Sequence, residues 1–554
     1  MTDLVITLSI VFVTAGILLL IGNRLNIPVV PLYIIAGVLA GQFIADETLI
    51  DLALWGIAFL VFVFGIRVNL DDLRLVLRDG EGAAATRIAV VAPVALTVGY
   101  VLGGLFGVEA QLRNAIYFGA AATLCSTLVG GHVRREETQL EITYGRLASA
   151  VHFFDDIVAI GVVLVLSAET LTDAQLVTSN LGFGVIFVLA GLFIYRHGFP
   201  LLLRAADGDE ELVLMGSISL LIGFVAAAEL AGVSIVVGAF AAGLAVREEG
   251  SETLGVRNGI RSITDFFAAI FFVTVGALVA VPTVEVLVLA GVLIVLVAVL
   301  NPLIHTFAFI YEGYDGRTAF LAGFSLNQVS EFALVIAIQA WLLGTIADTV
   351  FNGIILAAAV TMIFAAFTNQ YKNRIYDVLF APLLGNQTGY IDRHSDVTDG
   401  ITDHIVVLGY GRHGRQIVEE LKSLGCQYVV VENDPVRRED LQTNCENYVF
   451  GDVIADYPME LAELSDARLV VSTIDHQPVS ESLLDRDFTG DLILKSDSSR
   501  EASSFLDAGA TFVAVADVLA SDQLVETIER AVDTETERDS LGDNHPGTDV
   551  LSDD

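Results

Sequence analysis

Two adjacent carboxylates, Asp155 and Asp156, lie inside an otherwise apolar stretch that runs from about Gly145 to Ser167. This stretch is close to the roughly 20 residues that a helix needs to cross the hydrocarbon core of a bilayer. An ionised Asp at the middle of such a helix costs about 2.5 to 3.5 kcal/mol, so a pair of them requires water, a cation or protons. The alternative is a frayed helix end in water, but apolar residues flank the pair for two turns on each side. We therefore interpret Asp155 and Asp156 as a functional site.

The composition predicts a polytopic membrane protein with a soluble appendage. Of the 554 residues, 54% are hydrophobic, far too many for a wholly soluble chain. Apolar runs fill residues 4–367, whereas the chain from Asp392 onward has the composition of a soluble domain. We predict a transmembrane domain over residues 1–371, a linker over 372–401, a soluble domain over 402–532 and a disordered acidic tail over 533–554.

The net charge of −38 argues against nucleic acid as a partner, because phosphate binding requires a basic surface. Lys372, Lys422 and Lys495 are the only lysines. So acidic a surface stays soluble where salt screens charge strongly, which favours a halophilic, haloarchaeal source over a merely acidic soluble domain. The three cysteines, at positions 125, 426 and 445, have neither the spacing of metal ligands nor that of a disulfide framework. We interpret them as free thiols, and we predict no transition-metal site.

About thirteen transmembrane helices are predicted from the apolar runs. The arginines between the runs or near their ends, Arg87 among them, fall on one side, which the positive-inside rule makes cytoplasmic. An odd number of spans then places the N-terminus outside the plasma membrane and everything after Tyr371 in the cytoplasm. The runs cover residues 4–21, 27–44, 49–66, 83–107, 113–131, 145–168, 180–199, 211–228, 230–246, 260–280, 283–311, 317–343 and 349–369.

Two of these runs are interrupted in their middle. The stretch 120–131 is rich in small and hydroxyl residues, includes Ser126 and Thr127, and ends in two glycines. The stretch 324–332 carries Gln328 and a buried acid, Glu331. Broken helices from two inverted repeats meet at the membrane midplane of secondary transporters and build the ion site there. Taken singly, each stretch could instead serve close packing between helices, but the two together predict a pair of crossed broken helices.

The soluble domain opens with a nucleotide-binding pattern. A buried strand ending at Leu408 precedes three glycines, Gly409, Gly411 and Gly414, and a second strand ends at Glu432. The glycines would let the backbone approach a diphosphate at a helix N-terminus, and Glu432 could bind a ribose diol. Further alternation of strands and helices predicts a doubly wound Rossmann-like domain. The predicted ligand is NAD(H) or an adenine nucleotide such as AMP, ADP or ATP, with Arg412 in the glycine loop and Asp452 near the adenosine.

A family resemblance is carried by several motifs in a fixed order and spacing. They are Ile27-Pro28 with residues 32–41, the stretch 125–127, Asp155-Asp156-Ile157, residues 231–243, residues 271–276 and Gln328-Val329-Ser330-Glu331-Phe332. On these motifs the chain resembles Kef-type members of the monovalent cation:proton antiporter family two, with a regulator-of-potassium-conductance domain of the TrkA N-terminal type. The resemblance covers residues 4–531. It implies an inverted-repeat fold in which a mobile core domain slides against a dimerisation domain, and it implies a homodimer.

The resemblance also implies roles at the ion site. Asp156 would bind the transported Na⁺ or K⁺ in competition with a proton, Asp155 would be auxiliary, and backbone carbonyls near Ser126 and Thr127 would complete the site. Kef-type exporters typically have Gln-Asp at the positions of this carboxylate pair. Sodium/proton antiporters of the same superfamily have Asp-Asp there, together with a Lys that faces the first Asp. The position of that Lys is Asn301 here. Without this charge partner, Asp155 could titrate as well, which would allow more than one proton per cation.

Other polar residues keep alternative interpretations. Glu331 could assist the site or close a hydrogen bond between crossed helices. Gln328 and Asn301 could satisfy backbone groups of the broken helices, and His152 could pack or tune the site. For all three, binding of the cation or proton is the less favoured interpretation. The nucleotide would bias the conformations of the transporter. A nucleotide-gated potassium efflux system or channel is the first alternative, and a membrane-anchored NAD-dependent oxidoreductase is a more distant one, since no catalytic residues follow Asp475. The sequence leaves open Na⁺ versus K⁺, stoichiometry, the effect of nucleotide and any glutathione gate.

Overall fold

The computed structural model describes residues 2–25, 27, 29–43, 46–67, 73–126, 143–166, 174–206, 209–246, 254–279, 281–384, 388–398, 400–516, 518–521 and 523–525. Contacts divide the chain into two units, Met1–Asn386 and Gln387–Asp554. Each unit has its own hydrophobic core. The predicted acidic tail, residues 533–554, lies outside the described residues.

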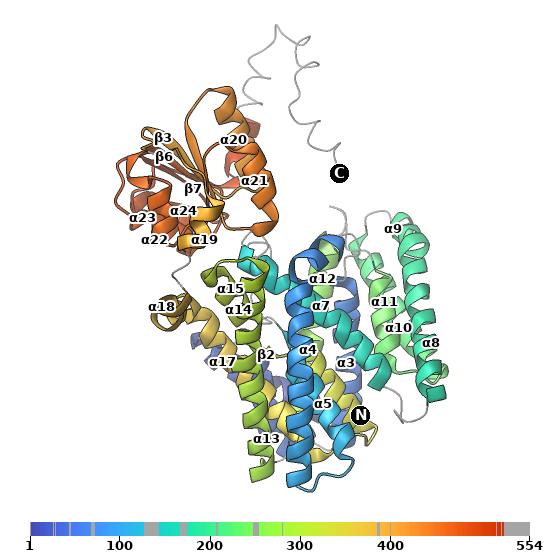
Figure 1. The fold of residues 1–554 in the computed structure, drawn as a ribbon. Helices are drawn as coiled ribbons and strands as arrows, with labels where there is room; N and C mark the ends of the chain where they lie inside the picture. Colours follow the sequence, from blue (N-terminus) through green and yellow to red (C-terminus); the bar gives the residue numbers. More distant parts are fainter. Residues whose placement is uncertain are drawn as a thin grey trace. The chain divides into compact units, whose positions relative to one another are not determined.

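The first unit is helical (Figure 1). Its helices are α1 (Thr2–Arg24), α2 (Val29–Ala40), α3 (Asp46–Arg67), α4 (Leu73–Leu105), α5 (Gln111–Thr123), α7 (Thr143–Leu166), α8 (Ala174–Phe193), α9 (Phe199–Ala206), α10 (Glu210–Leu230), α11 (Ile235–Leu244), α12 (Leu254–Ala277), α13 (Val284–Val295), α14 (Asn301–Glu312), α15 (Gly316–Phe324), α16 (Glu331–Leu342), α17 (Asp348–Ile375) and α18 (Ala381–Leu384). Short helical turns extend some of them: η1 (Gly41–Phe43) after α2, η2 (Ile194–Gly198) before α9, η4 (Leu296–Leu300) before α14 and η5 (Tyr376–Phe380) after α17.

Each predicted apolar run overlaps one of these helices or two consecutive ones. Within the described residues, five helical segments are long and apolar enough to cross a membrane, and six shorter apolar helices accompany them. Large apolar side chains such as Leu20, Phe193 and Val284 remain mostly exposed. Helices that are apolar on their outer side as well as toward the core are typical of a lipid-embedded protein. A helical membrane domain, as the sequence predicts, is therefore confirmed.

Glycines bring two pairs of helices into close contact. A Cβ atom on Gly37 of α2 would lie 2.0 Å from the Val273 carbonyl oxygen of α12, and one on Gly243 of α11 would lie 2.1 Å from the Phe62 carbonyl oxygen of α3. Both glycines belong to motifs that carry the family resemblance. Their role is steric, because only the absence of a side chain lets these backbones touch, as small residues do between membrane helices.

The stretch that we predicted as a linker, 372–401, begins as helix. Helix α17 continues to Ile375, and η5 and α18 extend the helical path to Leu384. Phe320 of α15 packs against the Tyr376 and Phe380 rings of η5. Apolar aromatic contacts therefore hold this end of α17 in the first unit, and the division after Asn386 falls inside the predicted linker.

The second unit is a doubly wound α/β domain, as predicted. Six parallel strands lie in the order β5-β4-β3-β6-β7-β8. The strands are β3 (His404–Leu408), β4 (Tyr428–Glu432), β5 (Tyr448–Phe450), β6 (Ala467–Ser472), β7 (Asp491–Lys495) and β8 (Phe512–Ala514), and the helices are α19 (Thr388–His394), α20 (Arg412–Ser423), α21 (Arg438–Asn444), α22 (Asp456–Leu461), α23 (Gln477–Leu484) and α24 (Ser499–Asp507), with short turns η6 (Pro435–Arg437) and η7 (Leu464–Asp466).

Helices cover both faces of this sheet. Alternate residues of the central strand β3 enter two separate cores: Val407 packs with residues of α20 and α21, and Val406 with residues of α23 and α24. Figure 1 shows α20 and α21 together on one side of the sheet. Because these strands are parallel, the carboxyl ends of β3, β4 and β5 lie at one edge of the sheet. Ligands bind at this edge in open α/β sheets.

Candidate functional site

The two interrupted runs cross in extended conformation. Strand β1 (Cys125–Ser126), which follows α5, pairs antiparallel with β2 (Gln328–Val329), which joins α15 to α16. Cys125 lies opposite Val329, and Ser126 lies opposite Gln328. The Ser330 N–H donates to the Leu124 carbonyl at 3.3 Å. The two interruptions thus cross as predicted, although Thr127 and the residues that follow it up to 142 lie outside the described residues.

Polar side chains satisfy backbone groups that the breaks release. The Asn301 amide of α14 donates to the Ala122 carbonyl of α5 at 2.9 Å. The Thr361 hydroxyl of α17 accepts from the Val329 N–H at 3.2 Å, and the Ser330 hydroxyl accepts from the Phe332 N–H at 3.1 Å. Non-helical backbone is tolerated at membrane depth only where such partners exist. Asn301 thus has the backbone role that we expected for it.

Asn301→Ala is expected to lower the thermal unfolding midpoint in detergent. Helix α5 ends at Thr123, so the Ala122 carbonyl has no helical partner beyond the last turn, and leaving it unpaired costs about 1–3 kcal/mol. Asn352→Ala is the matched control. It removes an amide that is also buried, at 7% exposed against 0% for Asn301, and that donates to the Asp348 carbonyl within α17, where the carbonyl keeps its helical bond. Equal midpoints for the two variants would contradict this role of Asn301.

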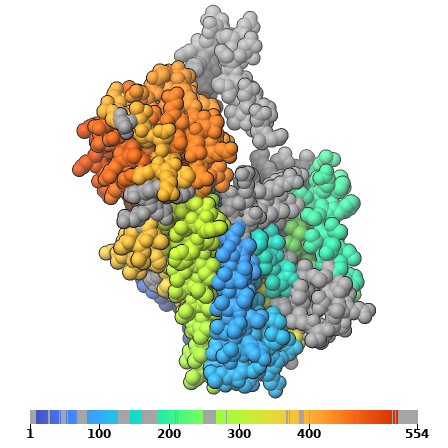
Figure 2. Space-filling model, viewed as in Figure 1, coloured from blue at the N-terminus to red at the C-terminus, as the bar shows by residue number. Residues whose placement is uncertain are grey.

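Asp155 forms a buried ion pair with Arg87 of α4. The Arg87 Nη1 atom donates to Asp155 Oδ2 at 2.7 Å, and Nη2 bonds Oδ1. Both side chains are almost completely buried. Figure 2 shows the face of the first unit on which α4 (blue) lies beside α14 (yellow-green), and contacts also join α4 to α7. A two-bond contact of this kind is the strongest form of carboxylate pairing.

This ion pair corrects two expectations from the sequence. Arg87 is not a loop residue, because α4 extends from Leu73 to Leu105 and includes it. Nor does Asp155 lack a charge partner, since Arg87 supplies from α4 the positive charge that Asn301 cannot supply from α14. The physical reason is that a buried carboxylate needs a compensating charge, and a neighbouring helix can provide it as well as the one opposite. The sequence did contain a signal for this partner, because Arg87 lies a few positions inside the predicted span 83–107.

The same cluster reaches the crossover through Cys125. The Cys125 N–H and thiol lie 3.3 Å and 3.1 Å from Asp155 Oδ2, and Arg87 also contacts the thiol. Cys125, Cys426 and Cys445 are all free cysteines, as their spacing predicts. Asp155 therefore ties α7 both to α4 and to the first residue of β1.

Asp156 is the second carboxylate of the pair, and its surroundings differ. Its side chain is 7% exposed, and its Oδ2 atom lies 3.5 Å from the Nε2 atom of His152, one helical turn away. Gln328 is buried in β2, and Glu331 begins α16 as a partly exposed residue. Helix α7 contacts both β1 and α16. The structure thus brings Asp155, Asn301 and Gln328 to the crossover and places Asp156 and Glu331 on helices that touch it.

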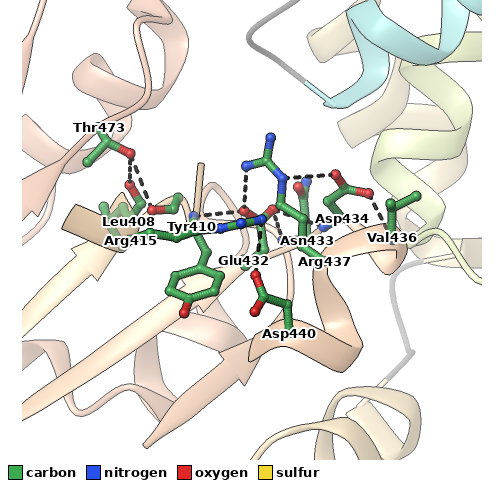
Figure 3. Close-up of polar contacts among 11 residues, drawn as sticks. Leu408, Tyr410, Arg415, Glu432, Asn433, Asp434, Val436, Arg437, Asp440 and Thr473 are labelled. Carbon is green, nitrogen blue, oxygen red and sulfur yellow. Dashed lines mark hydrogen bonds and ion pairs between the residues drawn. The ribbon is translucent and has the colours of Figure 1, made fainter. Parts of the chain in front are cut away.

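The glycine loop of the second unit joins β3 to α20, and Figure 3 shows polar contacts of the residues around it. Gly409, directly after β3, has φ of +90°, a conformation that favours glycine. A Cβ atom on Gly414 would lie 2.0 Å from the Gly409 carbonyl oxygen, so the loop closes tightly onto the start of α20. Thr473, after β6, donates its hydroxyl to the Leu408 carbonyl at 2.9 Å and holds the loop from the other side.

Glu432 binds the same loop. Its Oε2 atom accepts from the Tyr410 N–H at 2.8 Å, and its Oε1 atom accepts from the Asn433 and Asp434 N–H groups at 2.8 and 2.9 Å. Arg437 lies beside this carboxylate, with Nη1 3.4 Å from Oε2, and its Nε atom lies 3.3 Å from Asp434 Oδ2. Sequence reasoning located Glu432 but missed Arg437 and Asp434, which belong to the turn after β4.

The remaining predicted residues lie at the same edge of the sheet. Arg412 is exposed at the first position of α20. Asp452 is buried after β5, and its Oδ1 atom accepts from the Ile454 N–H at 3.1 Å. Burial raises the pKa of the Tyr410 hydroxyl and of the Cys445 thiol. Among the described residues, no three His, Cys, Asp or Glu side chains gather as a metal site.

Comparison with protein-family models gives two matches. Residues 9–370 match the model described as sodium/hydrogen exchanger, transmembrane, and residues 405–515 match the TrkA-N domain. The two matches fall on the two structural units.

Individual relatives match across both units. YbaL of Escherichia coli (strain K12), which bears the name of a cation/proton antiporter, is 28% identical over 499 residues, covering 85% of this chain and 87% of YbaL. The glutathione-regulated potassium-efflux system protein KefC of Salmonella schwarzengrund is 26% identical and covers 83% of this chain and 74% of KefC. Among solved structures, the sodium proton antiporter MjNhaP1 of Methanocaldococcus jannaschii is 14% identical, covers 68% of this chain and 99% of that one, and has a TM-score of 0.47.

Proposed function

Since the chain belongs to the sodium/hydrogen exchanger family and is therefore a cation/proton antiporter rather than an enzyme, we propose that a monovalent cation and a proton compete for Asp156. The supporting observation is that the two carboxylates of the pair have different partners. Arg87 binds Asp155 through both carboxylate oxygens, so a proton or cation that enters the pair is expected at Asp156. One carboxylate that takes either ligand, exposed in turn to each side, is sufficient for antiport.

The crossover supplies what a dehydrated cation needs besides a carboxylate. Sodium and potassium ions are hard cations that take oxygen ligands, and extended backbone at membrane depth presents carbonyl oxygens. The β1–β2 pair places such backbone next to α7. We assign the carbonyls near Ser126 and Thr127 and the Gln328 amide as candidate ligands. Glu331, at the start of α16, would act from the rim of the site.

The two ions are distinguished by a side-by-side measurement. Purified protein in liposomes would be given a pH gradient and either Na⁺ or K⁺ outside, with proton movement followed by an entrapped dye. Exchange that saturates with cation concentration, and whose apparent KM for the cation rises as the pH falls, supports competition at one site. An apparent KM independent of pH would contradict it.

Exchange is expected to be electroneutral, with one cation for one proton. Arg87 occupies both carboxylate oxygens of Asp155, so we expect only Asp156 to change its ligand in each cycle. The alternative, in which Asp155 also carries a proton, predicts more than one proton per cation. The measurement is transport in liposomes at zero pH gradient with an imposed membrane potential. A transport current, or a rate that follows the potential, would show that more than one charge moves.

For the second unit we propose regulation by NAD(H) or an adenine nucleotide. The fit rests on the tight cradle formed by Gly409, Gly411 and Gly414, where a Cβ would collide or crowd the loop, and on Glu432 at the end of β4. Gly411, Gly414 and Arg412 would hold the phosphates, Glu432 the ribose, and Asp452 would lie near the adenosine. Binding would change the populations of the transporter's conformations, which requires different affinities for them.

Assembly and orientation are also proposals. The basic loops predict that the N-terminus is outside and that the second unit is in the cytoplasm of a plasma membrane, and the family resemblance implies a homodimer. Cross-linking in native membranes would test the homodimer. Labelling of cysteines introduced one at a time near each terminus would test the orientation.

A further inference from the structure

We infer that Arg437 exchanges partners when nucleotide binds, leaving the Glu432 carboxylate for the phosphate groups of the ligand. This inference depends on the proposed nucleotide function of the second unit. It adds a phosphate-binding residue and a ligand-driven ion-pair switch to the cradle that the glycine motif predicts.

The first observation is the saturation of Glu432. An ionised carboxylate has about four lone-pair sites for donors. Three are used by the Tyr410, Asn433 and Asp434 N–H groups, and Arg437 approaches the Oε2 atom that Tyr410 also uses. A ribose hydroxyl that donates to Glu432 therefore competes with Arg437 rather than with the backbone amides, which the chain holds in place.

The second observation is the position of the guanidinium. A Cβ atom on Gly411 would lie 3.1 Å from Arg437 Nη1, so this side chain lies against the glycine loop. Gly411 is the residue before α20, and the first N–H groups of a helix form an anion site. Arg437 thus lies where the phosphates of a bound nucleotide would be, and Figure 3 shows its guanidinium joined by dashed lines to Glu432 and Asp434.

The third observation is that the present contacts of Arg437 are weak. They are single-atom contacts of 3.4 Å to Glu432 and 3.3 Å to Asp434 rather than a two-bond pair, and the side chain is 29% exposed. The Glu432 carboxylate is itself only 6% exposed. Its three bonds from backbone N–H groups stay in place when Arg437 leaves, and a ribose hydroxyl would take the position of the guanidinium. Asp434, whose Oδ1 atom accepts from the Val436 N–H at 3.0 Å, stays in place and can keep the guanidinium near the loop.

The experiment uses the full-length protein in detergent and titrates it with ADP and with NAD. Arg437→Gln is expected to weaken binding of both by about tenfold or more, the size of a lost hydrogen bond to a charged group. Arg437→Lys keeps the charge and should recover a large part of the affinity. Arg468→Gln is the matched control, because Arg468 lies near the start of β6, where its guanidinium contacts Cys426, at the opposite edge of the sheet.

The outcomes separate the inference from the function on which it rests. If the unaltered protein binds neither ADP nor NAD, the proposed nucleotide function fails. If it binds them and Arg437→Gln binds equally well, or if Arg437→Gln and Arg437→Lys lose the same affinity, the switch is overturned. Thermal unfolding of each variant without ligand is recorded as well. Should Arg437→Gln unfold, Arg437→Lys still tests the contact, because loss of the guanidinium fork should leave it measurably weaker than Arg468→Gln, and equal affinities of these two variants would overturn the switch.

Discussion

Asp156→Asn is expected to reduce cation/proton exchange by at least about a hundredfold. Asn has nearly the shape of Asp, but it cannot take up a proton at physiological pH and cannot balance a cation's charge. A buried cation without a compensating charge is too costly to bind. Position 156 can then bind neither the proton nor the cation, so the transport steps of both ions are impaired. The measurement is dye-reported exchange in proteoliposomes with Na⁺ and K⁺ in separate runs.

The matched control for this variant is Asp348→Asn. Asp348 also lies in the first unit, at the start of α17, where its Oδ1 atom accepts from the Trp341 indole at 2.8 Å. An Asn there can still accept that bond, so exchange should continue near the parental rate. Size-exclusion chromatography would show that both variants are folded. Exchange at an undiminished rate in Asp156→Asn would remove the basis of the proposed mechanism.

The positions of the two breaks could be predicted from the sequence because local chemistry determines them. Small and hydroxyl residues before Cys125 and the polar run around Gln328 weaken a helix in an apolar segment. The structure places β1 and β2 within these stretches. The glycine spacing similarly indicates the turn between β3 and α20, because the required backbone conformation at Gly409 leaves few other residue choices.

The partners of the acids could not be predicted, because they depend on tertiary packing. Arg87 and Asp155 are 68 positions apart, and nothing in their local sequence sets the rotation of α4 against α7. Nor does the sequence show that Asn301 would contact Ala122, 179 positions away. At Arg437 the difficulty is local instead: its position five residues after Glu432 is visible, but only the turn η6 brings it back to the glycine loop.

These partners change the interpretation of the carboxylate pair. From the sequence alone, Asp155 and Asp156 are two adjacent acids of comparable chemistry. In the structure Asp155 joins α4, α7 and β1 through Arg87 and Cys125, whereas Asp156 contacts His152 within its own helix. We therefore regard Asp155 as a structural charge that fixes the crossover against α7, and Asp156 as the residue that exchanges ligands.

Arg87→Gln is the variant expected to destabilise the membrane unit most. It leaves the Asp155 carboxylate buried without its cation, and breaking a buried ion pair from one side costs about 3–5 kcal/mol. Asp155→Asn should be destabilising as well, because it leaves the guanidinium buried without its anion. Both single variants should therefore show clearly lower unfolding midpoints in detergent than the parent. The test is the comparison of the unfolding midpoints of the two single variants with that of the parent protein.

The double variant Arg87→Gln/Asp155→Asn decides whether these losses come from the pair itself. Two amides of similar shape can bond to one another, so the double variant should be more stable than the two separate losses would give, by about 1–3 kcal/mol of coupling. The same cycle on Arg317 and Asp377, whose atoms lie 2.8 Å apart with Asp377 half exposed, should show about 0–1 kcal/mol. Additive losses at Arg87 and Asp155 would contradict the structural assignment.

Because Asp156 is intact in the double variant, this variant should still exchange cations for protons. Complete loss of exchange would mean that Asp155 takes a direct part in the cycle.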